Sequence, residues 1–118
     1  MDDCLFCRII KGELPAKIAY QDDLVTAFHD IDPQAPVHIL VVPNRHSESL
    51  AEMGDADAES LGRVVAVLNR VAEQEGVAAS GYRTLVNTGP DANQIVMHTH
   101  FHLLAGKPLG PMLSAFID

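Results

Sequence analysis

Residues 94–104 read Gln-Ile-Val-Met-His-Thr-His-Phe-His-Leu-Leu, and this stretch contains three of the six histidines of the chain. His98, His100 and His102 lie two residues apart in it. Side chains two residues apart on a β-strand point to the same face of a sheet. We therefore expect a strand over residues 95–104 that carries three imidazoles on one face and the odd-numbered residues 97–103 on the other.

A row of three imidazoles has two functional interpretations, because a neutral imidazole serves as a metal ligand or as a nucleophile. On a regular strand His98 and His102 are about 13 Å apart, too far for three bonds of about 2.1 Å to one ion. A phosphate ester fits better. A neutral nucleophile is repelled less by phosphate oxygens than a carboxylate is, and neighbouring imidazolium groups would neutralise the developing charge. We favour this second interpretation, with His100 attacking.

Length and charge limit the remaining possibilities. The 118 residues show no linker, repeat or low-complexity tract, so we expect a single domain over residues 1–118. Sixteen acidic and eight basic residues give a formal charge of −8, which disfavours a nucleic-acid partner but not a small phosphate ligand. No apolar run approaches the roughly 20 residues of a membrane span, and the N-terminus is acidic where a signal peptide is basic. We expect a soluble, cytoplasmic protein with no membrane partner.

The hydrophobic pattern predicts an α+β domain with a largely antiparallel sheet. Strands are expected over residues 18–21, 24–29, 38–43, 82–87 and 95–104. An apolar segment over residues 4–11 is compatible with one or two helical turns. The apolar residues Leu61, Val64, Val65, Leu68, Val71 and Ala72 recur at spacings of three and four. This spacing predicts one long helix from near residues 55–57 to just before Gly76, a fitting residue to end it.

Cys4 and Cys7 are the only cysteines of the chain and form a Cys-x-x-Cys motif. One such pair does not make the disulfide framework of a small secreted protein. The spacing suits either a metal site or a redox dithiol, and the two residues alone do not decide between them.

The run around the three histidines resembles the motif of the histidine-triad (HIT) family, His-x-His-x-His-x-x with apolar x. Residues 4–17, 28–46 and 81–87 are similar to segments of the Hint-like nucleotide-binding branch of that family. The resemblance extends in order over about residues 4–106. It implies a HIT-like fold, a largely antiparallel five-stranded sheet with one long helix and a short N-terminal helix.

The resemblance also implies an activity. The chain would be a purine nucleoside phosphoramidase, a nucleotide hydrolase or transferase acting at the α-phosphorus of an AMP-like substrate. His100 looks like the nucleophile that forms a covalent nucleotidyl-histidine, with one ring nitrogen held by the backbone carbonyl of His98. His102 and His38 would contact the phosphate and stabilise the developing charge. No metal would be required for this chemistry.

Binding roles follow from the same resemblance. Asp30 would bind the ribose hydroxyls, and Asn87 and Gln94 would bind the phosphate or the leaving group. An apolar slot for the purine base would be formed by Phe6, Ile9, Leu14, Phe28, His29 and Ile31. Two residues depart from the family pattern: Asn93 stands where glycine is common, and Ile95 where serine or another small residue is common. Both departures concern contacts on the leaving-group side of the site.

A structural zinc and a homodimer are further implications of the resemblance. Cys4, Cys7, His46 and His98 would bind the zinc, and four protein ligands leave no open position for a catalytic water. A metal-free, reduced dithiol is the alternative. The dimer would form through the long helix and the central strands, giving one continuous sheet with two sites.

Two other functions are compatible with the sequence. The first is hydrolysis of dinucleoside polyphosphates at the same histidine. The second is a weakly catalytic, nucleotide-binding regulatory module, which the altered residues 93–95 favour.

Overall fold

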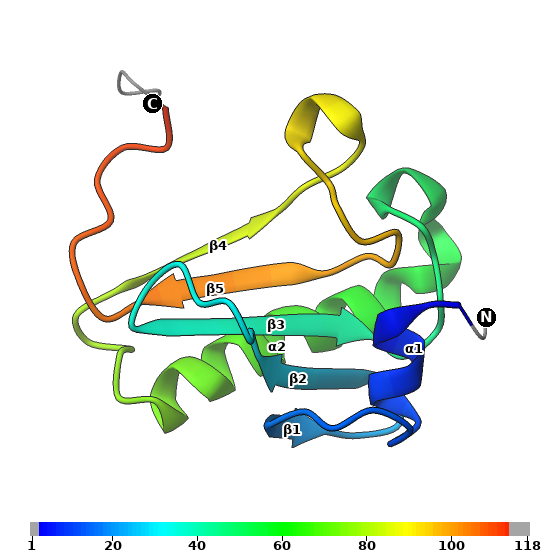
Figure 1. Cartoon of the computed structure of the whole chain (residues 1–118), viewed down its shortest axis with the longest axis horizontal. Coiled ribbons are helices and arrows are strands. Elements are labelled where there is room, and N and C mark those ends of the chain that lie inside the picture. The colour runs from blue at the N-terminus through cyan, green and yellow to red at the C-terminus, as the bar shows by residue number, and fades with distance from the viewer. Residues whose placement is uncertain (1–2, 114–118) are drawn as a thin grey trace.

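Five antiparallel strands form one sheet in the order β1-β2-β3-β5-β4. The strands are β1 (Ile18–Gln21), β2 (Val25–His29), β3 (Val37–Pro43), β4 (Tyr82–Val86) and β5 (Phe101–Ala105). The structure is a computed structural model that describes residues 3–113. Figure 1 shows β1 and β4 at opposite edges and β3 near the middle. The expected largely antiparallel five-stranded sheet is confirmed.

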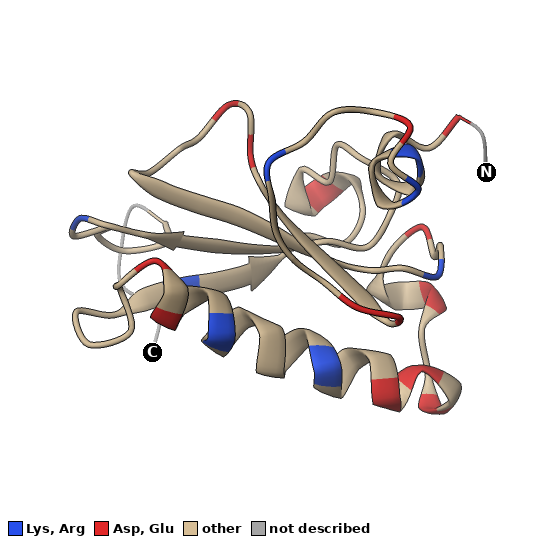
Figure 2. Cartoon of the chain, turned by 90° about the horizontal axis from the view of Figure 1, so that it is seen from below, with Lys and Arg blue, Asp and Glu red and all other residues tan. Residues whose placement is uncertain are grey.

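Two helices lie on opposite faces of this sheet (Figure 2). The helices are α1 (Leu5–Ile10) and α2 (Ala58–Gln74), and the short 3₁₀ turns are η1 (Leu50–Glu52), η2 (Asp55–Asp57) and η3 (Pro90–Ala92). The long helix therefore begins at Ala58, because the preceding residues form a 3₁₀ turn, and Gly76 follows its end with a φ of 74°. Among residues 3–113 no helix has the length and apolar character needed to cross a membrane.

The alternation of side chains along the strands divides the interior into two cores. The larger core lies under α2 and contains Val25, Ala27, Ile39, Val41, Leu103 and Ala105 together with the apolar stripe of the helix. The smaller core lies under α1 and contains Phe6, Phe28, Leu40 and Val42. Leu40 pairs directly with His102 across β3 and β5, so His102 and its neighbour His38 belong to the α1 face. The register therefore places these histidines beside the short helix.

The expected strand over residues 95–104 is wrong in its first half. β5 begins only at Phe101, and residues 93–100 form a bent segment. The backbone N–H of Thr99 donates to the carbonyl of Ser47 (2.9 Å) instead of joining the sheet. Thr99 is 1% exposed and Met97 is 47% exposed, so these two residues do not share one environment as a regular strand would require. Hydrogen bonds to the loop after β3, distant in the sequence, therefore override the alternating pattern.

The strand order also corrects the expected route of dimerisation. β3 and β5 have a partner strand on each side, so neither offers free backbone groups to a second copy. In the sheet formed by the described residues, only β1 and β4 are edge strands. A sheet continuous across two copies must therefore be joined through an edge strand and not through the central strands.

Candidate active site

A pocket of about 440 Å³ opens on the α1 face of the sheet, within the size range of small-molecule sites. We call it the histidine pocket. Its lining includes His38, His100, His102, Asp30, Asn87, Asn93 and Ile95. β3 supplies His38, β5 supplies His102, and the bent segment before β5 supplies His100. Residues more than sixty positions apart in the chain thus meet here.

The ring of His100 is fixed with one nitrogen facing the pocket. Its Nδ1 lies 2.7 Å from the backbone carbonyl oxygen of His98, the contact that the family resemblance implies. A carbonyl oxygen only accepts, so Nδ1 carries the hydrogen and donates. In the neutral ring Nε2 then keeps its lone pair. The ring is 7% exposed and contacts Phe6 edge-on, with ring centroids 5.2 Å apart. This is the state that a nucleophilic imidazole requires.

His38 and His102 form a directed hydrogen-bond chain. The backbone N–H of Gln34 donates to Nδ1 of His38 (3.0 Å), so the hydrogen of the neutral His38 ring is on Nε2. That Nε2 lies 2.9 Å from Nδ1 of His102 and donates to it. The hydrogen of His102 is therefore on its Nε2, a buried atom with no hydrogen-bond partner among the described residues. A buried donor of this kind is suited to a substrate oxygen.

The electrostatics agree with neutral rings in this chain. Burial is the main cause that lowers the pKa of His102 to about 4; the nearby His100 and His38 rings act in the same direction, and the charge of Asp30 opposes them. Burial also lowers the pKa of His38, although Asp30 and Asp32 oppose this effect. The expectation of neighbouring imidazolium groups is therefore corrected. At neutral pH this chain therefore offers phosphate the neutral Nε2–H donor of His102.

Asp30, His38 and His102 are close enough to suggest a metal site, since their ligand atoms lie within 4.8 Å of one another. The hydrogen-bond chain argues against one. Nδ1 of His38 accepts a hydrogen bond from the Gln34 backbone N–H. A metal on Nε2 would therefore require the imidazole to lose its only N-bound hydrogen. We assign these residues to the hydrogen-bond chain.

An apolar cavity of about 400 Å³ adjoins the histidine pocket, and we call it the base slot. It contains all six residues expected to hold a purine: Phe6, Ile9, Leu14, Phe28, His29 and Ile31. α1 forms one wall, and Phe6 packs edge-on against Phe28 with centroids 5.3 Å apart. Ile31 is 95% exposed and lies at the rim. Leu40 and Val96 line both cavities but were not expected. For Leu40 the signal was available, because it is two residues from His38 on the same strand.

Asp30 lies where the two cavities meet. It lines both of them, and its side chain is 20% exposed. One carboxylate oxygen accepts the backbone N–H of Asp32 (2.8 Å), and the other lies 3.5 Å from Nε2 of His38. A carboxylate at this junction lies beside the place that a ribose would occupy between a base in the slot and a phosphate at the imidazoles.

Gln94 has a different environment from its expected partners. Its side chain is absent from the pocket lining, and the residue is 8% exposed. The amide oxygen accepts the backbone N–H of Gly89 (2.9 Å), and the amide nitrogen donates to the carbonyls of Glu48 (2.6 Å) and Val96 (3.1 Å). In this structure Gln94 supports the loop, whereas Asn87, which was expected with it, lines the pocket.

Asn93 adopts the left-handed backbone conformation, with a φ of 62° and a ψ of 40°. Asparagine is among the few residues other than glycine that populate this region readily. Its backbone N–H donates to Pro90 (3.0 Å) and closes the turn. The asparagine therefore preserves the backbone path that glycine would follow and adds a side chain to the pocket wall.

Cys4, Cys7, His46 and His98 converge at the N-terminal end of α1. Nδ1 of His98 lies 3.3 Å from Sγ of Cys4, 3.5 Å from Sγ of Cys7 and 3.2 Å from Nδ1 of His46. Bonds of about 2.0–2.3 Å to a central zinc would give tetrahedral edges of about 3.3–3.8 Å. The donor set and its spacing therefore fit a tetrahedral divalent metal.

The surroundings of this cluster orient its ligands. Nε2 of His98 donates to the carbonyl of Pro43 (2.8 Å), which leaves the Nδ1 lone pair directed at the sulfur atoms. Burial lowers the pKa of His98 despite that hydrogen bond, and His46 and His100 lower it further. Burial and the adjacent Cys4 thiol raise the pKa of Cys7 to about 11.

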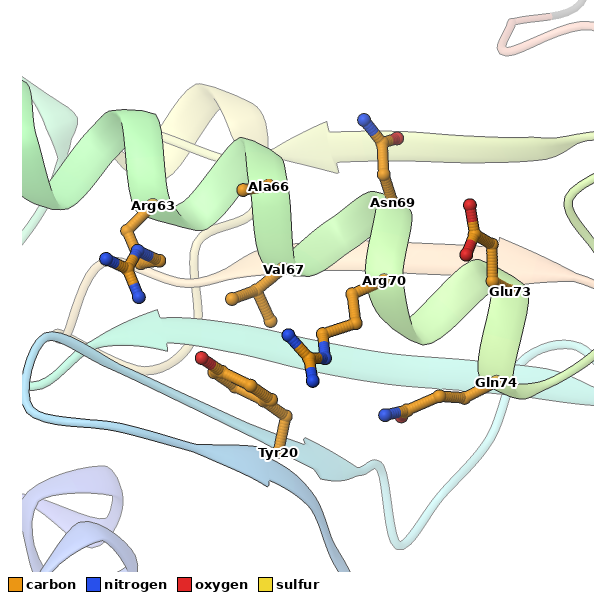
Figure 3. A pocket seen from close by; sticks show the side chains of 8 residues that line it. All are labelled: Tyr20, Arg63, Ala66, Val67, Asn69, Arg70, Glu73 and Gln74. Atoms are coloured by element: carbon orange, nitrogen blue, oxygen red, sulfur yellow. The ribbon is translucent and has the colours of Figure 1, made fainter.

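A larger groove of about 640 Å³ lies between α2 and β1, and its lining differs in chemistry from that of the histidine pocket (Figure 3). Arg63 and Arg70 extend from α2 toward Tyr20. Both guanidinium groups are already engaged, because Arg63 contacts Asp22 at 2.7 Å and Arg70 lies 5.0 Å from the Tyr20 ring centroid. The groove has no histidine or cysteine in its lining. The histidine pocket is therefore the candidate active site.

Comparison with known proteins agrees with this geometry. The family model for the HIT domain matches residues 11–109. The chain belongs to the HIT family. A HIT family hydrolase from Clostridium thermocellum superposes with a TM-score of 0.93 at 43% identity, covering 96% of this chain and 98% of that one. A histidine triad protein from Clostridium difficile gives a TM-score of 0.92 at 42% identity, with the same coverage.

Among relatives with assigned activities, the purine nucleoside phosphoramidase of Escherichia coli (strain K12) is 49% identical over 113 residues. The alignment covers 96% of this chain and 95% of the relative. Family membership and the HIT-like fold expected from the sequence are therefore confirmed.

Proposed function

We propose that this HIT-family chain, taken as one domain over residues 1–118, is a purine nucleoside phosphoramidase that acts through a covalent nucleotidyl-His100. The observation that carries the proposal is the ring of His100, whose Nδ1 is held by the His98 carbonyl (2.7 Å) at the floor of a pocket that adjoins a base-sized slot. The relative named as a phosphoramidase, at 49% identity over nearly its whole length, supports the same substrate class.

The reaction proceeds in two displacements. The Nε2 lone pair of His100 forms a bond to the α-phosphorus while the bond to the amine nitrogen breaks. The electron pair of that bond stays on nitrogen, which takes up a proton from solvent and departs as an amine. Water then attacks the same phosphorus and gives up a proton to solvent, the bond to Nε2 breaks, and AMP and the neutral imidazole are released.

The remaining residues bind and orient the nucleotide. The buried Nε2 hydrogen of His102 donates to a phosphate oxygen and stabilises the charge that develops there. His38 keeps that hydrogen in place through its 2.9 Å contact with Nδ1 of His102. The purine lies in the base slot beside Phe6, and Asp30 accepts hydrogen bonds from the two ribose hydroxyls.

Release of AMP distinguishes this function from its alternatives. We expect the protein to liberate AMP from an adenosine phosphoramidate faster than from a diadenosine polyphosphate, and a brief reaction quenched in alkali to contain AMP attached to the protein. Faster cleavage of the polyphosphate would favour the dinucleoside polyphosphate hydrolase. Calorimetric binding of AMP without release from either substrate would favour the regulatory module.

We also propose that Cys4, Cys7, His46 and His98 bind a structural zinc. Their spacing and the second hydrogen bond of His98 support this proposal. With four protein ligands the metal would hold the N-terminal segment to the segment before β5, and it would take no part in the reaction. Such thiolate ligands persist in a reducing compartment, in accord with a cytoplasmic protein.

We further propose a homodimer joined through β4, with α2 beside it. β4 is an edge strand, and its apolar residues Tyr82, Leu85 and Val86 are only partly buried; Arg83 and Thr84 lie between them. Val65 on α2 is 58% exposed, which adds apolar surface that a partner would cover. We expect light scattering at micromolar concentration to give about twice the chain mass of 12.8 kDa. A mass equal to one chain would contradict the dimer.

A further inference from the structure

Ile95 is an exposed apolar side chain at the mouth of the histidine pocket. It is 78% exposed, yet it lines the pocket with Asn87 and Asn93. It adds little to folding stability, because apolar side chains stabilise a protein only when they leave water. When a ligand covers the Ile95 side chain, the side chain leaves water and the contact favours binding.

The backbone on both sides of Ile95 is anchored. Gln94 is 8% exposed, and its side-chain amide makes hydrogen bonds to Gly89, Glu48 and Val96. Val96 lies in the wall shared by the histidine pocket and the base slot. Ile95 is therefore positioned before a ligand arrives, and contact with it costs little additional ordering.

The position of His100 directs the departing group toward the mouth of the pocket. His100 lies at the pocket floor and is 7% exposed. In a displacement at phosphorus the attacking and leaving atoms are roughly in line, so the amine faces away from His100. Ile95 lines the histidine pocket but not the base slot, so the purine does not cover it. The amine is therefore the part of the substrate that can cover Ile95.

We infer that Ile95 is a specificity-determining residue that favours phosphoramidates whose amine carries an apolar alkyl or aryl group. The inference rests on the proposed function and concerns the leaving-group side of the same site. Asp30 and Asp32 lie in this pocket, and the chain has a formal charge of −8. An amine that carries a carboxylate is therefore disfavoured, and the exposed Ile95 side chain favours an apolar group on the amine.

The test compares two substrates on three proteins. The substrates are unsubstituted adenosine phosphoramidate and its N-benzyl derivative, and the variants are Ile95→Ser and the control Ile18→Ser. Ile18 is 44% exposed on β1 and lines neither cavity. We expect Ile95→Ser to lower kcat/KM for the benzyl substrate about 5- to 10-fold, as loss of about 50 Å² of apolar contact implies. The ratio of kcat/KM for the benzyl substrate to that for the unsubstituted substrate should fall by a similar factor in Ile95→Ser, and Ile18→Ser should leave this ratio unchanged.

Binding of uncleavable analogues tests the contact with Ile95 independently of turnover. Uncleavable carbamate analogues of the two substrates are titrated by calorimetry, and the benzyl analogue should bind more tightly to the wild-type protein than to Ile95→Ser. An unchanged ratio of both kcat/KM and Kd in Ile95→Ser would overturn the role of Ile95 while leaving the phosphoramidase function standing. No AMP release from either substrate would overturn that function, and the calorimetric ratio would still decide whether Ile95 contacts the amine side.

Discussion

Replacing His100 by alanine is expected to lower kcat for adenosine phosphoramidate by about 10⁴-fold or more, the loss seen when a covalent nucleophile is removed. AMP affinity should change only a few-fold, because the base slot and Asp30 are untouched. The physical reason is that His100 is the histidine of the pocket whose Nε2 lone pair is free, whereas Nε2 of His38 and of His102 carries hydrogen. Initial rates and calorimetric binding of AMP measure the two effects separately.

His38→Ala is the matched comparison for this experiment. It removes the ring that holds the His102 hydrogen toward the pocket but leaves the nucleophile in place. A smaller loss of about 10²-fold is expected, typical of a lost electrostatic contact. The protein–AMP adduct should still form in His38→Ala and be absent in His100→Ala. An adduct that persists in His100→Ala would show that another residue attacks phosphorus.

Loss of the Cys/His cluster is expected to lower the melting temperature by roughly 10–15 °C. This corresponds to about 3 kcal/mol for a domain of this size, a modest part of what structural zinc sites contribute. The change is the double variant Cys4→Ala/Cys7→Ala, or treatment of the wild-type protein with a strong chelator. Metal analysis should give one zinc per wild-type chain and none in the variant.

The structure predicts that loss of the Cys/His cluster will mainly affect α1 and the base slot. α1 carries Cys7 in the cluster and Phe6 in the base slot, so hydrogen exchange should quicken over residues 4–11 and the KM for nucleotide should rise. The chelator should have no further effect on the double variant, which separates metal removal from other actions of the chelator. Equal melting of the two proteins together with metal-free wild type would contradict the zinc site.

The element types were accessible from the sequence because they depend on local periodicity. The spacing of apolar residues from Leu61 to Ala72 is sufficient to predict α2, and the continuous apolar run after His38 indicates a strand buried on both faces. The segment before β5 was not accessible in the same way. Its alternation imitates a strand, but hydrogen bonds from Thr99 to Ser47 and from the Gln94 side chain to its loop bend it. Ser47 is distant from Thr99 in the sequence, and the Gln94 bonds are made by a side chain. The periodicity of apolar residues predicts neither kind of contact.

The candidate site divides along the same line. The residue types of the histidine row indicated phosphate chemistry before any fold was known. The Cys-x-x-Cys motif left a metal site and a redox dithiol open, and only the family resemblance favoured zinc. The resemblance already implied the contact of His100 with the His98 carbonyl. The protonation pattern of His38 and His102 was inaccessible, since it depends on the backbone N–H of Gln34. A backbone group is the same in every sequence, so only its position reveals its role.

The sequence by itself determined which chemical groups this protein possesses and, except for residues 95–100, which of its segments form helices and strands. The tertiary structure alone decided that His98 turns its ring to the cysteines while His100 and His102 face the pocket, and that Gln94 supports the loop while Ile95 faces solvent. The reason is physical. Residue type and spacing act over a few positions of the chain, whereas the orientation of a ring or amide depends on hydrogen-bond partners contributed by distant segments.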